Sequence, residues 1–471
     1  MSFASDVPPT GTYDVAVLGG GIVGAAIARD LAAYDLSVAV LEARDDIGDG
    51  TSKANTAILH TGFDAKPGTL ESQLVRRGHE LLGAYAISTG IPVERTGALL
   101  VAWNDEEFEA LPGLRDKAVS NGYQHCELIG PEEVYAQVPA LAAGARGGLT
   151  VPDESIICTW TTNLALATDA RQRSVEILLQ SRVTGVEIGE ATTTLHTDSG
   201  AVTARWVVNA AGLGADYLDR EFGFDRFTVT PRRGELFVFD KLTRSMVERI
   251  VLPVPSSRGK GVLVSPTIYG NVMLGPTAED RTDRADTSTS ESGFEFLRSK
   301  GEALLPDLLR EEVTATYAGL RAATDHGDYL IDVAPERRYL LVGGIRSTGL
   351  TAGMAIAEYV VGMLAEAGLD LLPRTSLPEP PTMANIGETG VRPYADGARI
   401  AEDSEYGRLV CFCERVSAGE IRDACHSTLP PANLDGLRRR TRAMNGRCQG
   451  FYCGAAVRKV FGEHTEGDDD E

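Results

Sequence analysis

Five of the seven cysteines in this chain lie between residues 411 and 453, and two of them are separated by a single Phe. Four of the five form a C-x-C pair and a C-x4-C pair: Cys411 with Cys413, and Cys448 with Cys453. Thiolates are soft ligands that suit iron or zinc, and four of them around a metal would close a module too small to bury a core alone. The spacing therefore predicts an iron or zinc centre. The remaining thiols are interpreted as ordinary core or surface residues: Cys126, Cys158 and Cys425.

A second group of residues suits a phosphate ligand. Gly19, Gly21 and Gly24 form G-x-G-x-x-G between the strand-like run DVAVLG and a segment with helical periodicity. Glycines at this spacing let the backbone turn tightly and approach a pyrophosphate, whose charge is favoured at a helix N-terminus. Glu42 ends the next predicted strand and can accept hydrogen bonds from a ribose diol. These residues predict a dinucleotide-binding site.

Two later stretches favour a flavin over a nicotinamide dinucleotide. Residues 207–216, VVNAAGLGAD, form a strand that ends in small residues, where a backbone must pass close to the cofactor. Residues 342–360, VGGIRSTGLTAGMAIAEYV, repeat the order of strand, glycine turn and helix. The N-terminus of that helix can stabilise the anionic reduced ring. We expect the cofactor-binding residues to be Gly19, Gly21, Gly24, Glu42, Thr51, Ser52, Asn55, Val183, Ala211, Gly212, Gly344, Gly349 and Thr351.

The motifs GGGIVG, TSKANTAILHTGF, VVNAAG, TYAGLR and GIRSTGLTAG together resemble the FAD-dependent D-amino-acid-oxidase-type superfamily over roughly residues 12–370. Within it they are most similar to the branch of glycerol-3-phosphate dehydrogenases and oxidases and L-2-hydroxyglutarate dehydrogenases. The motifs are specific for FAD and for the fold, and much less so for the substrate.

The resemblance also implies residues that contact a substrate. His60 matches an active-site histidine of that branch, and a neutral imidazole suits the base that takes a hydroxyl proton while hydride moves to flavin N5. Arg321 and Arg346 lie where the superfamily brings cations to the anionic group of the substrate, and Arg232 and Arg233 enter a strand that relatives place near the pocket. The expected catalytic set is His60, Arg321, Arg346 and Arg233.

The cysteine module resembles the bacterioferritin-associated-ferredoxin-like [2Fe–2S] domain over about residues 406–460, which implies a cluster on its four cysteines. A structural zinc site with the same ligands is the alternative. A cluster is a one-electron outlet for a two-electron flavin, so it favours a dehydrogenase that passes electrons to a partner protein or quinone over an oxidase.

The expected substrate is a small anionic hydroxy compound, sn-glycerol 3-phosphate, which would be oxidised to dihydroxyacetone phosphate. Three alternatives stay open: a dehydrogenase for L-2-hydroxyglutarate or another 2-hydroxy acid, an amine or amino-acid dehydrogenase, and a non-catalytic flavin and cluster redox protein.

Strand and helix candidates alternate up to residue 372, which predicts an α/β (α+β) fold: a Rossmann-type FAD-binding domain interleaved with a sheet-rich substrate domain. The FAD-binding segments are about 12–80, 150–218 and 325–372, and the substrate-domain segments are about 81–149 and 219–324. Residues 373–405, rich in Pro, Gly and charge, are predicted to be a linker. The [2Fe–2S]-binding domain follows at 406–460, and 461–471 is predicted to be a disordered acidic tail.

The chain is strongly acidic, with 67 Asp and Glu against 45 Lys and Arg and a formal net charge of −22. Such a surface repels nucleic acids and anionic lipid, and it predicts a salt-adapted, halophilic protein.

The opening MSFASDVPPT lacks the basic start and apolar core of a signal peptide, and the apolar stretch LTAGMAIAEYVVGMLAEAG contains two Glu residues. We therefore expect a cytoplasmic protein without a transmembrane segment. Peripheral association with the inner face of the membrane through a partner, and oligomerisation, stay open.

Overall fold

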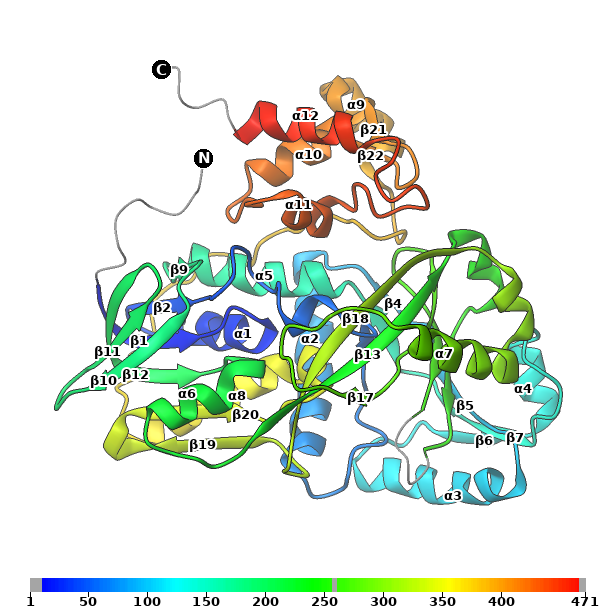
Figure 1. The fold of residues 1–471 in the computed structure, drawn as a ribbon, viewed down its shortest axis with the longest axis horizontal. Coiled ribbons are helices and arrows are strands. Elements are labelled where there is room, and N and C mark those ends of the chain that lie inside the picture. The colour runs from blue at the N-terminus through cyan, green and yellow to red at the C-terminus, as the bar shows by residue number, and fades with distance from the viewer. Residues whose placement is uncertain (1–10, 256–260, 466–471) are drawn as a thin grey trace.

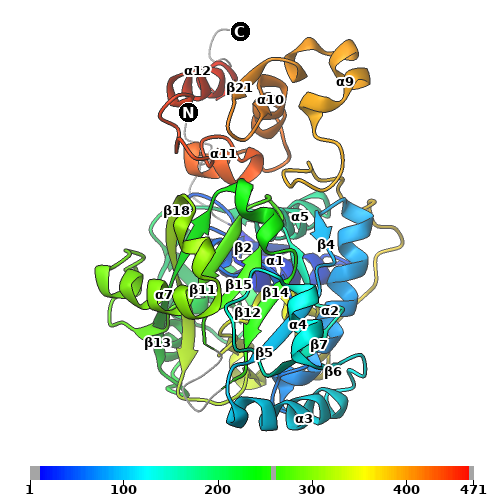
Figure 2. The same cartoon turned by 90° about the vertical axis from the view of Figure 1, so that its right-hand side faces the viewer.

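The computed structural model describes residues 11–255 and 261–465. Two large sheets and their helices form the main body, and a small module made by the last part of the chain sits on one end of it (Figure 1 and Figure 2). The opening MSFASDVPPT and residues 466–471 of the predicted acidic tail lie outside the described residues, whereas residues 461–465 belong to the last helix.

The first sheet has eight strands and carries the glycine motif. Its central strands are parallel and apolar, and they are buried on both faces because helices cover each side. Helix α1 follows β1 directly and packs against α5 and α8. The strands are β1 (Thr12–Leu18), β2 (Val38–Leu41), β9 (Glu176–Leu178), β10 (Val183–Ile188), β11 (Thr193–Thr197), β12 (Gly200–Asn209), β19 (Leu330–Ala334) and β20 (Tyr339–Gly343).

The second sheet has nine strands and is largely antiparallel. Its two longest strands, β13 and β18, pair along almost their whole length. The strands are β5 (Ala98–Ala102), β6 (Glu127–Ile129), β7 (Gly147–Val151), β13 (Val229–Phe239), β14 (Ile250–Pro253), β15 (Leu263–Pro266), β16 (Val272–Gly275), β17 (Glu279–Asp280) and β18 (Val313–Thr324). A three-stranded sheet lies beside it, formed by β3 (Ile58–Leu59), β8 (Ser155–Ile157) and β4 (Val93–Glu94).

The helices of the body begin and end at clear local signals, such as the Thr69 side chain that caps the start of α2 and the left-handed Gly90 at its end. They are α1 (Ile22–Leu31), α2 (Leu70–Thr89), α3 (Asp105–Ser120), α4 (Pro131–Gln137), α5 (Thr159–Gln172), α6 (Ala215–Glu221), α7 (Glu291–Leu304) and α8 (Gly349–Glu366).

The chain passes repeatedly between the two sheets. Residues 12–41, 176–209 and 330–343 supply strands to the first sheet, and residues 98–151 and 229–324 supply strands to the second. The predicted mixed α/β fold is confirmed.

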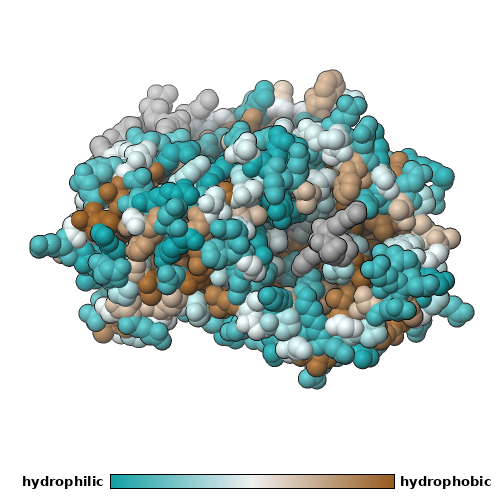
Figure 3. All heavy atoms as spheres, turned by 60° about the horizontal axis from the view of Figure 1, so that its bottom comes forward, coloured by the Kyte–Doolittle hydropathy of each residue, from teal (hydrophilic) through white to brown (hydrophobic). Residues whose placement is uncertain are grey.

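The face opposite the module is mostly hydrophilic, and its apolar residues form small separate areas (Figure 3). Within the described part of the chain, no helix is both long and apolar enough to cross a membrane. The most apolar one, α8, is instead buried between α1 and α2.

Residues 373–405, predicted to be a linker, pack along the body. The Arg374 guanidinium donates to three backbone carbonyls, including that of Tyr34 at 2.9 Å. Farther on, Ile386 is only 3% exposed and Arg392 forms a 3.0 Å ion pair with Glu420 of the module. The segment is therefore a strap held at several points.

The module has its own small core around Ile421, Leu437 and Val457. Residues 409–463 carry nine Arg and Lys against five Asp and Glu, a net charge of +4 in a chain of −22. A basic module thus sits on an acidic body. Its elements, with α9 of the strap, are α9 (Gly397–Glu402), β21 (Leu409–Cys411), β22 (Val416–Ser417), α10 (Ala418–Cys425), α11 (Leu434–Thr441) and α12 (Gly454–Thr465).

Candidate active site

The turn between β1 and α1 requires glycine at two positions. Gly19 has φ +106°, a left-handed conformation that side chains rarely adopt. A Cβ on Gly24 would lie 1.9 Å from the Gly19 carbonyl oxygen, so the helix could not approach the strand with any other residue. No side chain caps the start of α1 from Gly21, although Ser52 Oγ accepts from the Ile22 N–H at 2.9 Å. Free N–H groups at a helix N-terminus fit a pyrophosphate.

Glu42 lies at the end of β2, next to this turn. Its Oε2 accepts from the Gly20 N–H at 2.7 Å, and its Oε1 accepts from the Arg44 N–H at 2.9 Å. Burial raises the pKa of Glu42 above its ordinary value. Each oxygen keeps a further lone pair, so the carboxylate fits a ribose diol while it holds the turn.

Thr51, Ser52 and Asn55 form the loop that follows β2, and their side chains fix its shape. Thr51 Oγ1 donates to the Leu320 carbonyl at 2.9 Å, and Asn55 Nδ2 donates to the Ser52 carbonyl at 2.9 Å. Below we call residues 51–55 the cofactor loop. Its side chains are occupied within the protein, so its backbone is what remains to contact a ligand.

The other predicted cofactor residues lie at strand ends and at the start of α8. Gly212 (φ +55°) and Gly344 (φ +68°) turn the chain after β12 and β20. Gly349, at the start of α8, packs closely on Ile345, since a Cβ would lie 3.0 Å from Ile345 Cγ2. Thr351 Oγ1 accepts from the His60 N–H at 3.0 Å. Ala211 precedes Gly212, while Val183 lies on β10, away from this helix start.

His60 is paired with a buried carboxylate that the sequence did not reveal. Its Nδ1 lies 3.0 Å from Glu154 Oε2, and Glu154 is fully buried. The other Glu154 oxygen accepts from the N–H and hydroxyl of Thr61 at 2.7 and 2.9 Å. A carboxylate at Nδ1 favours the tautomer that carries its proton there, which leaves Nε2 as an acceptor. Among the described residues Nε2 has no hydrogen-bond partner, so the imidazole is arranged as a base.

Three of the four arginines of interest lie on the β13–β18 pair and divide between its two faces, whereas Arg346 follows β20. Arg232 lies directly opposite Arg321 in the register, whereas Arg233 lies opposite Leu320. Residues opposite one another share a face and neighbours along a strand alternate, so Arg233 and Arg321 point to opposite faces.

Arg321 faces the cofactor loop. Two positions before it on the same face, a Cβ on Gly319 would lie 2.3 Å from the Ala54 carbonyl oxygen. The Arg321 guanidinium fills space left by Gly234, where a Cβ would lie 3.0 Å from its Nη2. Within the described part of the chain Arg321 has no carboxylate partner. Burial, and then repulsion from Arg232, lower its pKa. A half-buried, unpaired guanidinium is suited to an anionic ligand.

The other three arginines are already neutralised. Arg233, 2% exposed, pairs with Glu279 at 2.6 Å and Glu235 at 3.0 Å and lies 3.3 Å from Asp286. Two more pairs complete the group: Arg232 with Asp280 at 2.6 Å and Arg346 with Glu71 at 2.8 Å.

The four predicted metal ligands lie together in the module. Side-chain interactions join the thiols in a row: Cys411 interacts with Cys453, Cys453 with Cys448, and Cys448 with Cys413. No three His, Cys, Asp or Glu side chains among the described residues surround a single metal ion. A [2Fe–2S] cluster divides its four thiolates between two irons, so this serial arrangement fits a cluster.

The loops around the cysteines turn backbone N–H groups toward sulfur. Burial would raise the pKa of Cys448, but donors that include the N–H groups of Tyr452 and Gly450 outweigh it and lower the pKa. Four residues of these loops other than glycine are left-handed, a conformation that needs support from the surrounding packing: Arg415, Arg442, Met444 and Gln449. Such loops form concave N–H sites for anionic clusters.

The module is held on the body by buried ion pairs. Arg440 of α11 makes two 2.8 Å bonds to the carboxylate of Asp46, which is 2% exposed, and Arg439 adds a third at 2.7 Å. Asn433 bonds Asp45 nearby at 2.7 Å. This contact joins α11 to the turn after β2.

Asp46→Asn is expected to loosen the module, because it leaves Arg440 buried without a charge partner at a cost of about 3 kcal/mol. Thermal unfolding and limited proteolysis of the strap would measure this at neutral pH. Asp435→Asn, which removes an exposed pair with Arg438, should change neither. Equal stability of the two variants would contradict the role of Asp46.

Low pH should loosen the module as Asp46→Asn does. Burial alone would raise the pKa of Asp46, but Arg440 and Arg439 outweigh it and hold the pKa below its ordinary value. The stabilisation is therefore complete above the ordinary carboxyl pKa of about 4 and is lost as the pH falls through the lowered value.

Comparisons with known proteins identify the family of this chain. Residues 14–363 match the FAD dependent oxidoreductase (DAO) family, and residues 409–463 match the BFD-like [2Fe-2S] binding domain. The chain belongs to the DAO family of FAD-dependent oxidoreductases and carries a C-terminal [2Fe–2S]-binding domain. The predicted family, FAD cofactor and cluster are confirmed.

Several relatives are similar to this chain over different shares of its length. Glycerol 3-phosphate dehydrogenase of Caloramator mitchellensis is 32% identical over 450 residues, 95% of this chain and 94% of that protein. Glycerol 3-phosphate oxidase of Mycoplasma pneumoniae is 31% identical over 365 residues, 75% of this chain and 94% of that protein. The structure of dithionite-reduced L-alpha-glycerophosphate oxidase from Mycoplasma pneumoniae with FAD bound superposes with a TM-score of 0.75 at 29% identity, covering 80% of this chain and 100% of that one.

Proposed function

We propose that this protein is an FAD-dependent dehydrogenase that oxidises sn-glycerol 3-phosphate to dihydroxyacetone phosphate and passes the electrons through a [2Fe–2S] cluster to a partner protein or quinone. The observation that carries the proposal is the His60–Glu154 pair, a base beside the start of α8. The similarity over 95% of the chain to a glycerol 3-phosphate dehydrogenase supports the substrate.

The residues of the site divide the work between a base and an anion-binding group. FAD, when bound, supplies a hydride acceptor. His60 Nε2 takes the proton of the C2 hydroxyl, and Glu154 at Nδ1 holds the ring in place and stabilises its positive charge. Arg321 holds the phosphate, because a guanidinium can donate two parallel hydrogen bonds to it. His60 would thus take the proton of the alcohol whose hydride the bound FAD would accept.

The outer side of the module supports an external electron acceptor. Three aromatic residues adjoin the cluster cysteines in sequence and are 71%, 86% and 81% exposed: Phe412, Phe451 and Tyr452. Aromatic residues this exposed on a redox module suit contact with a partner. Electron transfer to a partner at these aromatic residues would make O₂ unnecessary as the acceptor.

Anaerobic flavin bleaching by a small panel of substrates tests the proposal. Bleaching by sn-glycerol 3-phosphate, with none by L-2-hydroxyglutarate, amines or amino acids, is the expected result. Faster bleaching by another member of the panel would reassign the substrate, and no bleaching by any member would point to a non-catalytic redox role.

A further inference from the structure

A series of side-chain contacts runs from the cofactor loop to the module, through residues that catalysis does not use. Trp160 Nε1 donates to the carbonyl oxygen of Lys53, in the cofactor loop, at 3.0 Å. The Trp160 ring packs on Tyr269, with 5.2 Å between ring centroids. The guanidinium of Arg442, from the module, lies 4.1 Å from the centroid of Tyr269 and 5.7 Å from that of Trp160. The two rings therefore form a wall between the cofactor loop and the module.

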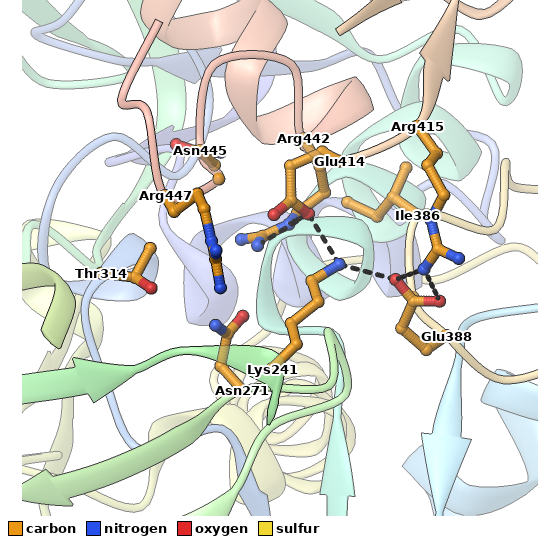
Figure 4. Close-up of polar contacts among 12 residues, drawn as sticks. Lys241, Asn271, Thr314, Ile386, Glu388, Glu414, Arg415, Arg442, Asn445 and Arg447 are labelled. Carbon is orange, nitrogen blue, oxygen red and sulfur yellow. Dashed lines mark hydrogen bonds and ion pairs between the residues drawn. The ribbon is translucent and has the colours of Figure 1, made fainter. Parts of the chain in front are cut away.

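On its other side Arg442 binds the loop that carries Cys411 and Cys413, which we call the cluster loop. It pairs at 3.1 Å with Glu414, which directly follows the ligand Cys413 in sequence. Arg442 and Glu414 are 6% and 2% exposed. Lys241 of the body also reaches Glu414, at 3.1 Å, and bonds Glu388 of the strap (Figure 4). A buried pair of this kind tolerates little displacement, since either charge alone would be costly to bury.

The backbone of Arg442 is held as firmly as its side chain. It ends α11 in the left-handed conformation, φ +71°, which is unfavourable for a residue with a Cβ and persists only when its surroundings enforce it. The other interface arginines differ. Arg440 is buried but bonds Asp46, while the side chains of Arg415 and Arg447 are 41% and 47% exposed. Among these four, only Arg442 touches both the aromatic wall and a neighbour of a cluster ligand.

We propose that Arg442 is a positioning residue for electron exit, which fixes the cluster loop against the Trp160–Tyr269 wall so that electrons enter the module at this contact. The inference rests on the proposed function. Oxidation of one alcohol gives two electrons and two protons. A [2Fe–2S] cluster accepts one electron at a time, so two single transfers cross the contact in each turnover, and the partner protein or quinone takes both.

The test measures internal electron transfer directly. In the anaerobic holoenzyme, a light flash with an external photoreductant reduces the flavin, and absorbance and EPR follow the appearance of the reduced cluster. Arg442→Met, with FAD and iron contents of the wild type, is expected to slow cluster reduction about tenfold or more, because small displacements of reacting groups have large effects on rate. Arg415→Met, which removes an interface pair with Glu388 away from the aromatic wall, should react at the wild-type rate.

A second pair of variants approaches the contact from the body and leaves the cluster loops intact. Tyr269→Leu, which removes the ring under the guanidinium, should slow cluster reduction as Arg442→Met does, and Tyr269→Phe should not. The proposal is overturned if Arg442→Met and Tyr269→Leu transfer at the wild-type rate with both cofactors bound, or if Arg415→Met is as slow as Arg442→Met. Flash reduction needs no substrate, so a failure of sn-glycerol 3-phosphate to bleach the flavin would affect only the proposed function.

Discussion

His60→Ala is expected to lower kcat with sn-glycerol 3-phosphate by on the order of 10²-fold or more. In the proposed mechanism the imidazole accepts the hydroxyl proton, and alanine leaves no acceptor in its place. FAD should stay bound, since the contacts that His60 makes to its surroundings through the backbone, to Thr351 and His79, remain in the variant. Steady-state rates with an artificial dye measure kcat, and the flavin absorbance of the purified protein measures how much FAD stays bound.

His125→Ala is the matched control, because His125 is exposed and contacts Asp153 and Tyr123, away from His60. Its kcat should equal that of the wild type. The kcat of Glu154→Gln should lie between those of His60→Ala and His125→Ala. The amide oxygen can still accept from Nδ1, but it no longer stabilises the imidazolium that forms. If His60→Ala turned over as fast as His125→Ala, His60 would have no part in the mechanism.

Features of this site that depend on neighbours in sequence were predictable, and those that depend on distant residues were not. The turn at Gly19–Gly24 needs only the residues on either side of it, so the motif specified it. The partner of His60 lies 94 positions away. Glu154 sits in the short turn between β7 and β8, in the polar sequence PDES, where nothing distinguishes it from a solvated acid.

The arginines illustrate the same limit. Arg232 and Arg233 are adjacent, and the sequence offers no reason to prefer either. Strand alternation sends them to opposite faces, and only the register with β18 decides which face meets the cofactor loop. That register was not readable from the chain. It places Arg321 toward the cofactor loop and Arg233 among three carboxylates.

Composition was a poor guide to the strap. Residues rich in Pro, Gly and charge are typical of a linker, but here the charged ones meet fixed partners: Arg374 meets carbonyls of the body, and Glu388 meets Lys241 and Arg415. The acidic total charge likewise hid a basic module. Because opposite charges are separated between body and module, the chain can be strongly acidic and still hold its cluster domain by arginine–carboxylate pairs.

Arg321→Met is expected to lower kcat/KM for sn-glycerol 3-phosphate by about 10²-fold, the effect of removing one partner from a buried charge pair. The loss should fall mainly on KM, because the phosphate is bound in the ground state as well as in the transition state. Arg321 is the arginine on this face without a carboxylate partner among the described residues, so we expect the phosphate of the proposed substrate to balance its charge. Flavin content should not change, since among the described residues no hydrogen bond or ion pair joins the guanidinium to the cofactor loop.

Arg232→Met is the control that distinguishes direct phosphate binding by Arg321 from the loss of one positive charge nearby. Arg232 lies opposite Arg321 on the same face but is exposed and paired with Asp280, so its loss should leave KM unchanged, whereas Arg321→Lys should recover part of the affinity as a single donor without the fork. We expect Arg321→Met to bind sn-glycerol 3-phosphate most weakly and Arg321→Lys to have an intermediate affinity. Arg232→Met should have the KM of the wild type. An unchanged KM in Arg321→Met would mean that the phosphate is bound elsewhere, and Arg346, released from Glu71, would be the next residue to test.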